Sequence, residues 1–187
     1  MFSGSMLLGP VVPITEGLQL ATAAINCVAA ALLISAGVSK LARPDPFRHA
    51  LEEVVGRTGR LVSRTWIRLI AVFEIVAGVS LTTAPSRVPG AVAAGCLGIC
   101  FVVLGVAGSI RGSRLPCGCF GATNGRRPFG WVNVVSGAFF ILLLLTNLLQ
   151  SVVVQTVPSL YLVSIAIVGW TFWVHRGLVG GVLVRRA

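Results

Sequence analysis

Apolar residues follow one another in long runs along this chain, and the runs are separated by short polar segments. Five runs reach the roughly 17–25 residues that an α-helix needs to cross a bilayer core about 30 Å thick. We predict spanning helices at residues 18–42, 65–83, 89–110, 130–149 and 159–174. The pattern therefore predicts an all-α fold, a polytopic membrane helix bundle that forms one integral membrane domain over residues 1–187.

Composition supports a membrane protein and excludes a nucleic-acid partner. Hydrophobic residues make up 56% of the chain and charged residues 11%, whereas about a quarter of a soluble domain is charged. The mean hydropathy is +0.94. The net charge of +10 lies between the apolar runs rather than on a solvated domain, which is the pattern of a membrane protein with basic loops on one side.

Basic residues predict the orientation of the chain. They gather between the first and second helices, between the third and fourth, and after the fifth: Lys40, Arg43, Arg48, Arg57, Arg60, Arg64; Arg111, Arg114, Arg126, Arg127; Arg176, Arg185 and Arg186. The opposite side carries Arg87. With five spans in the cell membrane, we expect the N-terminus outside and the C-terminus in the cytoplasm. Because no Lys or Arg precedes Lys40, we expect the first helix to be retained rather than cleaved as a signal peptide.

A shorter helix is predicted at about residues 46–55, between the first two spans. Asp45 is the expected N-cap, and Pro46 fits the first turn. Its apolar residues recur at helical spacing opposite the charged ones: Phe47, Ala50, Leu51, Val54 and Val55. We interpret it as a surface helix lying on lipid headgroups, with a partner-docking surface as the alternative. His49 belongs to the polar face and is interpreted as solvated.

Glu74 interrupts the second apolar run. A carboxylate inside a membrane is costly unless it is protonated or paired. Lys40, near the end of the first helix, is the expected partner because a helical side chain leans toward the N-terminus. Small residues nearby, including Gly37 and Gly78, would let the two helices approach closely. A structural ion pair and a proton-relay or quinone-contacting acid both remain open as roles.

The segment 111–130 carries two cysteines, Cys117 and Cys119, on either side of Gly118. Five glycines and two prolines in it exclude a regular helix. A Cys-X-Cys disulfide forms a tight ring, which favours an exchange centre over a structural bridge. The flanking arginines would stabilise a thiolate; they are Arg114, Arg126 and Arg127. Phe120 is a candidate to shield the sulfurs, and Gly121 to permit the following turn.

Metal binding and inert structural cysteines are the alternatives for this segment. Zinc sites combine four N or S ligands from Cys pairs two or more residues apart, and here a second pair and a histidine are missing. Cu(I) fits the ligand type. We predict thiol–disulfide chemistry and no metal. Cys27, Cys96 and Cys100 lie inside predicted helices and are interpreted as small hydrophobic residues, with a second redox pair of Cys27 and Cys96 as the alternative.

The stretch "RGSRLPCGCFGA", followed by a membrane helix, resembles the signature of the methylamine utilisation protein MauE family. "LISAGVSKLARPDPFRHAL" and "FEIVAG" are similar to that family and to the wider DoxX-like group. The resemblance extends from the first helix through the fourth. It implies a four-helix DoxX-like core with a fifth transmembrane helix added, a redox pair at Cys117 and Cys119, and buried polar positions at Lys40 and Glu74.

The resemblance also implies a function. Members of the family are tied to disulfide formation or maturation of periplasmic proteins. MauE itself is needed for the small subunit of methylamine dehydrogenase, alongside a thioredoxin-like redox protein. A thiol–disulfide oxidoreductase is thus expected, and quinone is the cofactor left open. The alternatives are a non-enzymatic assembly factor and a quinone-linked thiol oxidoreductase of DoxX type. Charge counting places the Cys-Gly-Cys loop at the cytoplasmic face, whereas client maturation outside the cell would favour the other face.

Overall fold

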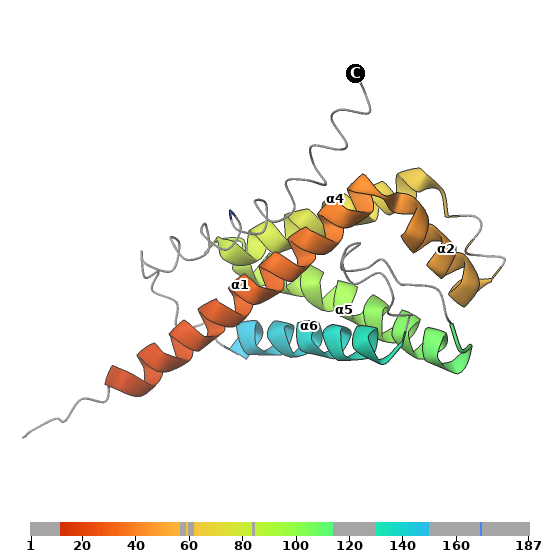
Figure 1. Ribbon diagram of the computed structural model, residues 1–187. Helices are drawn as coiled ribbons and strands as arrows, with labels where there is room; N and C mark the ends of the chain where they lie inside the picture. The colour runs from red at the N-terminus through yellow and green to blue at the C-terminus, as the bar shows by residue number, and fades with distance from the viewer. Residues whose placement is uncertain are drawn as a thin grey trace, which may run out of the picture.

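The structure, a computed structural model, describes residues 12–56, 59, 62–83, 85–113, 130–149 and 169. Regular structure in these residues is helical: α1 Val12–Ala42, α2 Pro44–Val55, α4 Arg64–Thr82, α5 Arg87–Ile110 and α6 Trp131–Leu149 (Figure 1). Four stretches are long and apolar enough to cross a membrane: Ala21–Ala42 of α1, and α4, α5 and α6. The predicted all-α polytopic membrane bundle is confirmed. The predicted fifth span, 159–174, lies outside the described residues.

The helices begin close to the residues expected from sequence, with two informative differences. Helix α1 begins at Val12, ahead of the predicted residue 18. Helix α2 begins at Pro44 rather than after Asp45. A proline at the first helical position sets the helical φ angle in advance, so Asp45 falls inside the first turn. The prediction that Asp45 caps α2 was therefore wrong, because Arg43 takes the N-cap position without a side-chain hydrogen bond.

Two closely packed helix pairs build the bundle. Helix α1 packs along α4 and α5 packs along α6, and the pairs are joined mainly where α4 meets α5. Helices α1 and α6 approach each other near the C-terminal end of α6 and diverge toward the end of the bundle that carries α2 (Figure 1). The larger hydrophobic core contains Ala29, Ala30, Leu33, Ala77, Leu81, Ala91, Ala94, Leu97, Phe101, Phe140 and Leu143.

Small residues set the distance between paired helices. A side-chain carbon added to Gly37 of α1 would lie 2.5 Å from the carbonyl oxygen of Ala71 in α4. One added to Gly98 of α5 would lie 2.7 Å from the carbonyl oxygen of Gly137 in α6. Backbones that approach this closely gain packing contacts, which drive association between membrane helices. The predicted role of Gly37 in helix approach is confirmed.

Helix α2 packs its apolar face on the protein rather than on lipid. Its residues Phe47, Ala50, Leu51 and Val54 are buried in a second core with Ile67 of α4. Helix α2 contacts α1, α4 and α5. The sequence interpretation, in which this face lies on lipid headgroups, was therefore wrong about what covers the face. A hydrophobic stripe shows that a face is buried, but it does not show whether protein or lipid buries it.

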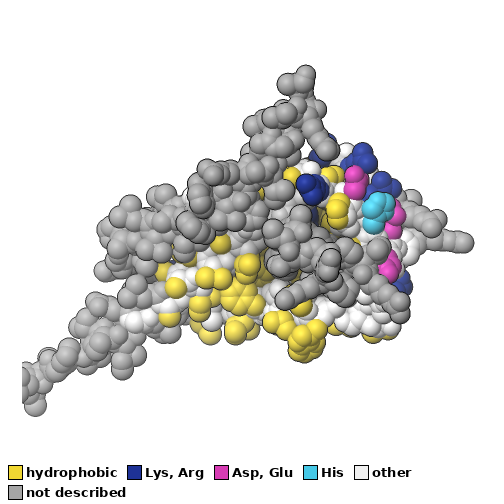
Figure 2. All heavy atoms as spheres, in the orientation of Figure 1, with side chains coloured by type: hydrophobic (Ala, Val, Ile, Leu, Met, Phe, Trp, Pro, Cys, Tyr) yellow, Lys and Arg dark blue, Asp and Glu magenta, His cyan; other side chains and the backbone are white. Residues whose placement is uncertain are grey.

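Charged and apolar surfaces separate along the bundle. Figure 2 shows acidic and basic side chains gathered at the end that carries α2, with hydrophobic side chains over the middle of this face. Trp66 and Trp131 are exposed in the first turns of α4 and α6. An amphipathic indole ring at a helix end is typical of the boundary between lipid and water.

Candidate functional site

Lys40 and Glu74 form a buried ion pair at the α2 end of the bundle. The Lys40 Nζ atom donates to both carboxylate oxygens of Glu74, at 2.6 and 2.7 Å. The two side chains are 0% and 1% exposed. Lys40 lies in the last turn of α1, three residues after the close crossing with α4 at Gly37. The structure thus brings together the pair expected from sequence, and the helix crossing explains why the two side chains reach each other.

Aromatic rings enclose the remaining side of the ammonium. The Lys40 Nζ atom lies 5.1 Å from the centroid of the Phe47 ring and 5.8 Å from that of Phe101. Rings at this range attract a cation through their quadrupole, more strongly where water is excluded. Helices α1, α2, α4 and α5 therefore all contribute side chains to the site, and its polar centre is desolvated. A role for the pair beyond structure stays a prediction.

The C-terminal end of α5 leads from this site toward the cysteines. The amide of Ser113 donates to the Gly108 carbonyl at 3.0 Å, and that of Gly112 donates to the Ser109 carbonyl at 3.3 Å. Gly112 has a φ of +62°, a conformation that glycine adopts readily. This pattern is the Schellman motif that terminates helices. It ends α5 and directs the chain away from the helix axis at Ser113.

Two contacts attach this turn to α2. The Ser113 Oγ atom donates to the Glu53 Oε2 atom at 2.5 Å. The Arg111 Nη1 atom donates to the Val54 carbonyl oxygen. Sequence reasoning named Val54 as an apolar residue and missed these contacts, because their partners lie 60 and 57 positions apart in the chain.

The predicted redox residues follow directly after this turn. The set comprises Arg114, Cys117, Gly118, Cys119, Phe120, Gly121, Arg126 and Arg127, and it lies outside the described residues. Their roles stay predictions. The structure describes both flanks of the segment, Ser113 after α5 and Gly130 before α6.

Comparison with known proteins places the chain in a family. The model of the methylamine utilisation protein MauE family matches residues 18–150, more than half of the chain. The chain belongs to this family. The matched range holds the four described spans and the Cys-Gly-Cys segment. No curated protein and no solved structure shows significant similarity. The resemblance stated from sequence is confirmed: the chain is a MauE-like, multi-pass membrane protein.

The remaining cysteines of this MauE-family protein do not pair with one another. No disulfide bond joins Cys27, Cys96 and Cys100. Cys27 is buried in α1, whereas Cys96 and Cys100 are exposed on α5. The alternative of a second redox pair between Cys27 and Cys96 is not realised in this structure. The described residues contain no cluster of three or more His, Cys, Asp or Glu side chains able to hold a metal ion.

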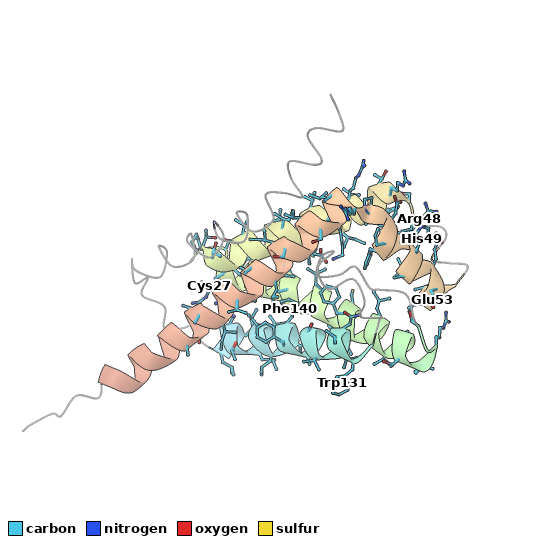
Figure 3. The ribbon with its side chains drawn as sticks, in the orientation of Figure 1. Cys27, Arg48, His49, Glu53, Trp131 and Phe140 are labelled. Carbon is cyan, nitrogen blue, oxygen red and sulfur yellow. The ribbon has the colours of Figure 1, made fainter. Side chains whose placement is uncertain are left out.

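His49 lies on the outer side of α2, as expected for a solvated residue. Its side chain is 64% exposed, and its Nδ1 atom lies 3.7 Å from the Glu52 Oε2 atom. Figure 3 shows His49 beside Arg48 on α2, away from the labelled side chains of the other helices, Cys27, Phe140 and Trp131. The residue therefore contributes to the charged surface of the MauE-family protein rather than to the buried pair.

A second polar contact, which sequence reasoning missed, joins the first and last described helices. Asn26 of α1 and Asn147 of α6 exchange two amide hydrogen bonds of 3.0 and 2.8 Å. Asn147 also donates to the Leu143 carbonyl oxygen at 2.8 Å. Both side chains are buried, at 2% and 0% exposure. The signal in the sequence was an amide inside each of two apolar runs, since such a group needs a partner in a membrane.

Proposed function

We propose that this protein is a membrane thiol–disulfide oxidoreductase that supports the maturation of a client protein. The observation that carries the proposal is the MauE-family match, which includes the segment with Cys117 and Cys119 between two spans. The family takes its name from methylamine utilisation. We infer that the client belongs to that metabolism and propose the small subunit of methylamine dehydrogenase.

The proposed reaction is dithiol–disulfide exchange with a thioredoxin-like partner. A thiolate of the pair attacks the partner's disulfide, and one partner sulfur leaves as a thiolate. The second cysteine then attacks the mixed disulfide, which releases the partner as a dithiol and leaves a disulfide between Cys117 and Cys119. Two electrons pass from the pair to the partner, and the two thiol protons end on the partner's sulfurs. The reverse sequence reduces the pair.

Charge supports the proposed reactivity of the cysteines. Arg114, Arg126 and Arg127 lie in the same segment, which contains no Asp or Glu from residue 111 to residue 130. Positive charge stabilises a thiolate, and the thiolate is the form that attacks a disulfide. We assign the nucleophile to Cys117, which follows Pro116 and precedes Gly118.

We propose that the cysteines face the cytoplasm. The end of the bundle at which α5 ends and α6 begins carries Arg43, Arg48, Arg64 and Arg111, whereas Arg87 begins α5 at the other end. The excess of basic residues marks the cytoplasmic side. The redox partner that meets the cysteines would then be a cytoplasmic thioredoxin-like protein, with quinone in the membrane as the alternative electron acceptor.

We assign the ion pair of Lys40 and Glu74 a supporting role. It links α1 to α4 beside α2, which contacts the turn that leads to the cysteines. An ammonium that donates to both oxygens of one carboxylate is suited to hold two helices together in lipid. A proton relay or a quinone-contacting acid is the functional alternative for Glu74.

Single substitutions of the two cysteines test the proposal. Cys119→Ser keeps the proposed nucleophile Cys117 and removes the cysteine that resolves the mixed disulfide, so this variant should accumulate a mixed disulfide with the partner, visible as a reducible band on a non-reducing gel. Cys117→Ser removes the nucleophile and should accumulate far less of it. Cys96→Ser is the matched control, because it removes an exposed thiol from the membrane-spanning part of α5. Client maturation should fail in the double Cys117→Ser, Cys119→Ser variant. Full maturation without trapping would instead identify a non-enzymatic assembly factor.

A further inference from the structure

We propose that Glu53 is a positioning residue for the cysteine-bearing segment. Through Ser113 it fixes the point at which the chain leaves α5 and enters that segment. The inference rests on the proposed function, because positioning matters only if the cysteines react. Its evidence lies in described residues alone, at the contact between the C-terminal ends of α2 and α5.

The contact between Ser113 and Glu53 has the geometry of a strong hydrogen bond. Its 2.5 Å separation joins a hydroxyl to a carboxylate oxygen, and hydrogen bonds to ionised acceptors are short and about twice as strong as neutral ones. Ser113 is 7% exposed. Glu53 lies at the end of α2 that faces the C-terminal end of α5 (Figure 3). The bond therefore joins segments 60 positions apart at the entrance to the cysteine segment.

Arg111 provides a second contact between the same two helix ends. Its guanidinium donates to the carbonyl oxygen of Val54, in the last turn of α2. Carbonyl groups in a last turn lack partners within the helix, and they carry the negative end of the helix dipole. Gly56, with a φ of +73°, ends α2 at this point. The cation thus satisfies an orphan carbonyl and complements the dipole.

The three acidic side chains of α2 serve different contacts. Asp45 accepts hydrogen bonds from Arg64 of α4, at 2.9 and 3.3 Å. Glu52 lies 3.0 Å from Arg48 within α2 itself. Glu53 reaches the turn after α5. The contact at Glu53 is thus specific to its position on the helix, and Glu52 provides a neighbouring carboxylate for comparison.

Helix α2 is anchored to the bundle, so it can fix the position of the turn after α5. Phe47 and Val54 are buried against the bundle, and the Phe47 ring faces the ammonium of Lys40. The buried ion pair and the entrance to the cysteine segment therefore lie at opposite ends of one short helix. A displaced α2 would shift Ser113 as well, since the two contacts at Glu53 and Val54 connect them.

Hydrogen–deuterium exchange and thiol alkylation of the full-length protein test the proposal together. In Glu53→Ala, the Gly112 and Ser113 amides should exchange about tenfold faster, since loss of a bond to a charged group loosens the turn. N-ethylmaleimide should modify Cys117 and Cys119 about threefold faster or more. Glu53→Gln keeps an oxygen acceptor but loses the charge, so both rates should lie between those of the parent protein and those of Glu53→Ala. Glu52→Ala, the matched control, removes an equal charge and should leave both rates unchanged.

Ser113→Ala tests the same bond from its other partner and does not depend on the folding of Glu53→Ala. It should reproduce both changes, and the double variant with Glu53→Ala should add little to either. The proposal would be overturned if Glu53→Ala and Glu52→Ala gave equal rates of amide exchange and cysteine alkylation. It would also be overturned if the effects of Glu53→Ala and Ser113→Ala were additive. Amide exchange does not depend on redox activity. A changed exchange rate with inert cysteines would thus reject the proposed function and leave the contact established.

Discussion

Lys40 and Glu74 are stable in the bundle because each compensates the charge of the other where water is absent. Both side chains are almost fully buried, and one ammonium serves both carboxylate oxygens. Transferring either charge alone into such a site costs several kcal/mol, and the attraction between them offsets that cost only while both are present. The buried site is therefore stable only when both residues are present, and either charge alone would destabilise the bundle.

Substitutions at this pair should be strongly non-additive. Lys40→Met or Glu74→Leu alone should lower the free energy of unfolding by about 3–5 kcal/mol, because each leaves an uncompensated buried charge. The double variant should lose less than either single variant. Unfolding in detergent, followed by circular dichroism, measures the three values. Additive losses would contradict a direct pairing.

The exposed pair of Asp45 and Arg64 provides the control. Its side chains are 47% and 61% exposed, and an exposed pair contributes roughly 0–1 kcal/mol. Asp45→Asn should therefore change stability far less than Glu74→Leu. A comparable loss in both would indicate a general effect of removing negative charge at this end of the bundle.

At the scale of elements, close packing between helices places the side chains of the candidate site. Lys40 reaches Glu74 because α1 and α4 approach at Gly37, where only a hydrogen fits against Ala71. Helix α2 is held by its apolar face and then receives the end of α5 through Glu53 and Arg111. Each step depends on a contact between elements that are distant in the chain.

Gly37→Ala should weaken the bundle although alanine favours helices. The added carbon would lie 2.5 Å from the Ala71 oxygen and 2.7 Å from Ile75 Cγ1, so the helices must separate. We expect a loss of about 1–3 kcal/mol, the usual cost of overpacking. Gly17→Ala is the matched control in the same helix, where the added carbon meets nothing within 4 Å. It should be neutral or stabilising by up to about 1 kcal/mol; equal effects would contradict the packing argument.

At the scale of the whole molecule, the distribution of charge relates the bundle to its membrane. The end with α2 carries most of the described charges, and exposed tryptophans begin α4 and α6 at that end. The lipid-facing middle displays apolar side chains, among them Leu69, Val76 and Val103. A protein that crosses a bilayer needs an apolar surface between its two ends, where the hydrocarbon core contacts it. The exposed apolar side chains of the bundle provide such a surface.

Reporter fusions test the proposed orientation. A reporter fused after Ser113 or after Ala187 should be active in the cytoplasm, and one fused after Thr83 or after Leu149 should be active outside. The physical reason is the excess of Lys and Arg in the segments on the cytoplasmic side. Equal location of the fusions after Leu149 and Ala187 would contradict a fifth span. Reversal of all four would contradict the orientation and place the cysteines outside.

The sequence predicted the spans because a long apolar run has few possible structures in a membrane. It predicted the pair of Lys40 and Glu74 because Glu74 had few possible partners. In lipid, every backbone polar group must be satisfied within the chain, so a long apolar run becomes a helix whatever its neighbours are. Glu74 lies well inside such a run, and Lys40 was the basic residue at a matching helix end. The composition and motif of the Cys-Gly-Cys segment likewise singled it out in the sequence, and its role stays a prediction.

Tertiary structure decided the contacts whose partners had many alternatives. The apolar stripe of α2 could have faced lipid, and only the positions of α4 and α5 show that Ile67 and its neighbours cover it. Asn26 and Asn147 meet across 121 positions, and Ser113 meets Glu53 across 60. Helix formation depends on residues a few positions apart, whereas these contacts depend on which helices pack together and at what rotation. Local periodicity therefore predicts where helices form, and it does not predict which helices pack together.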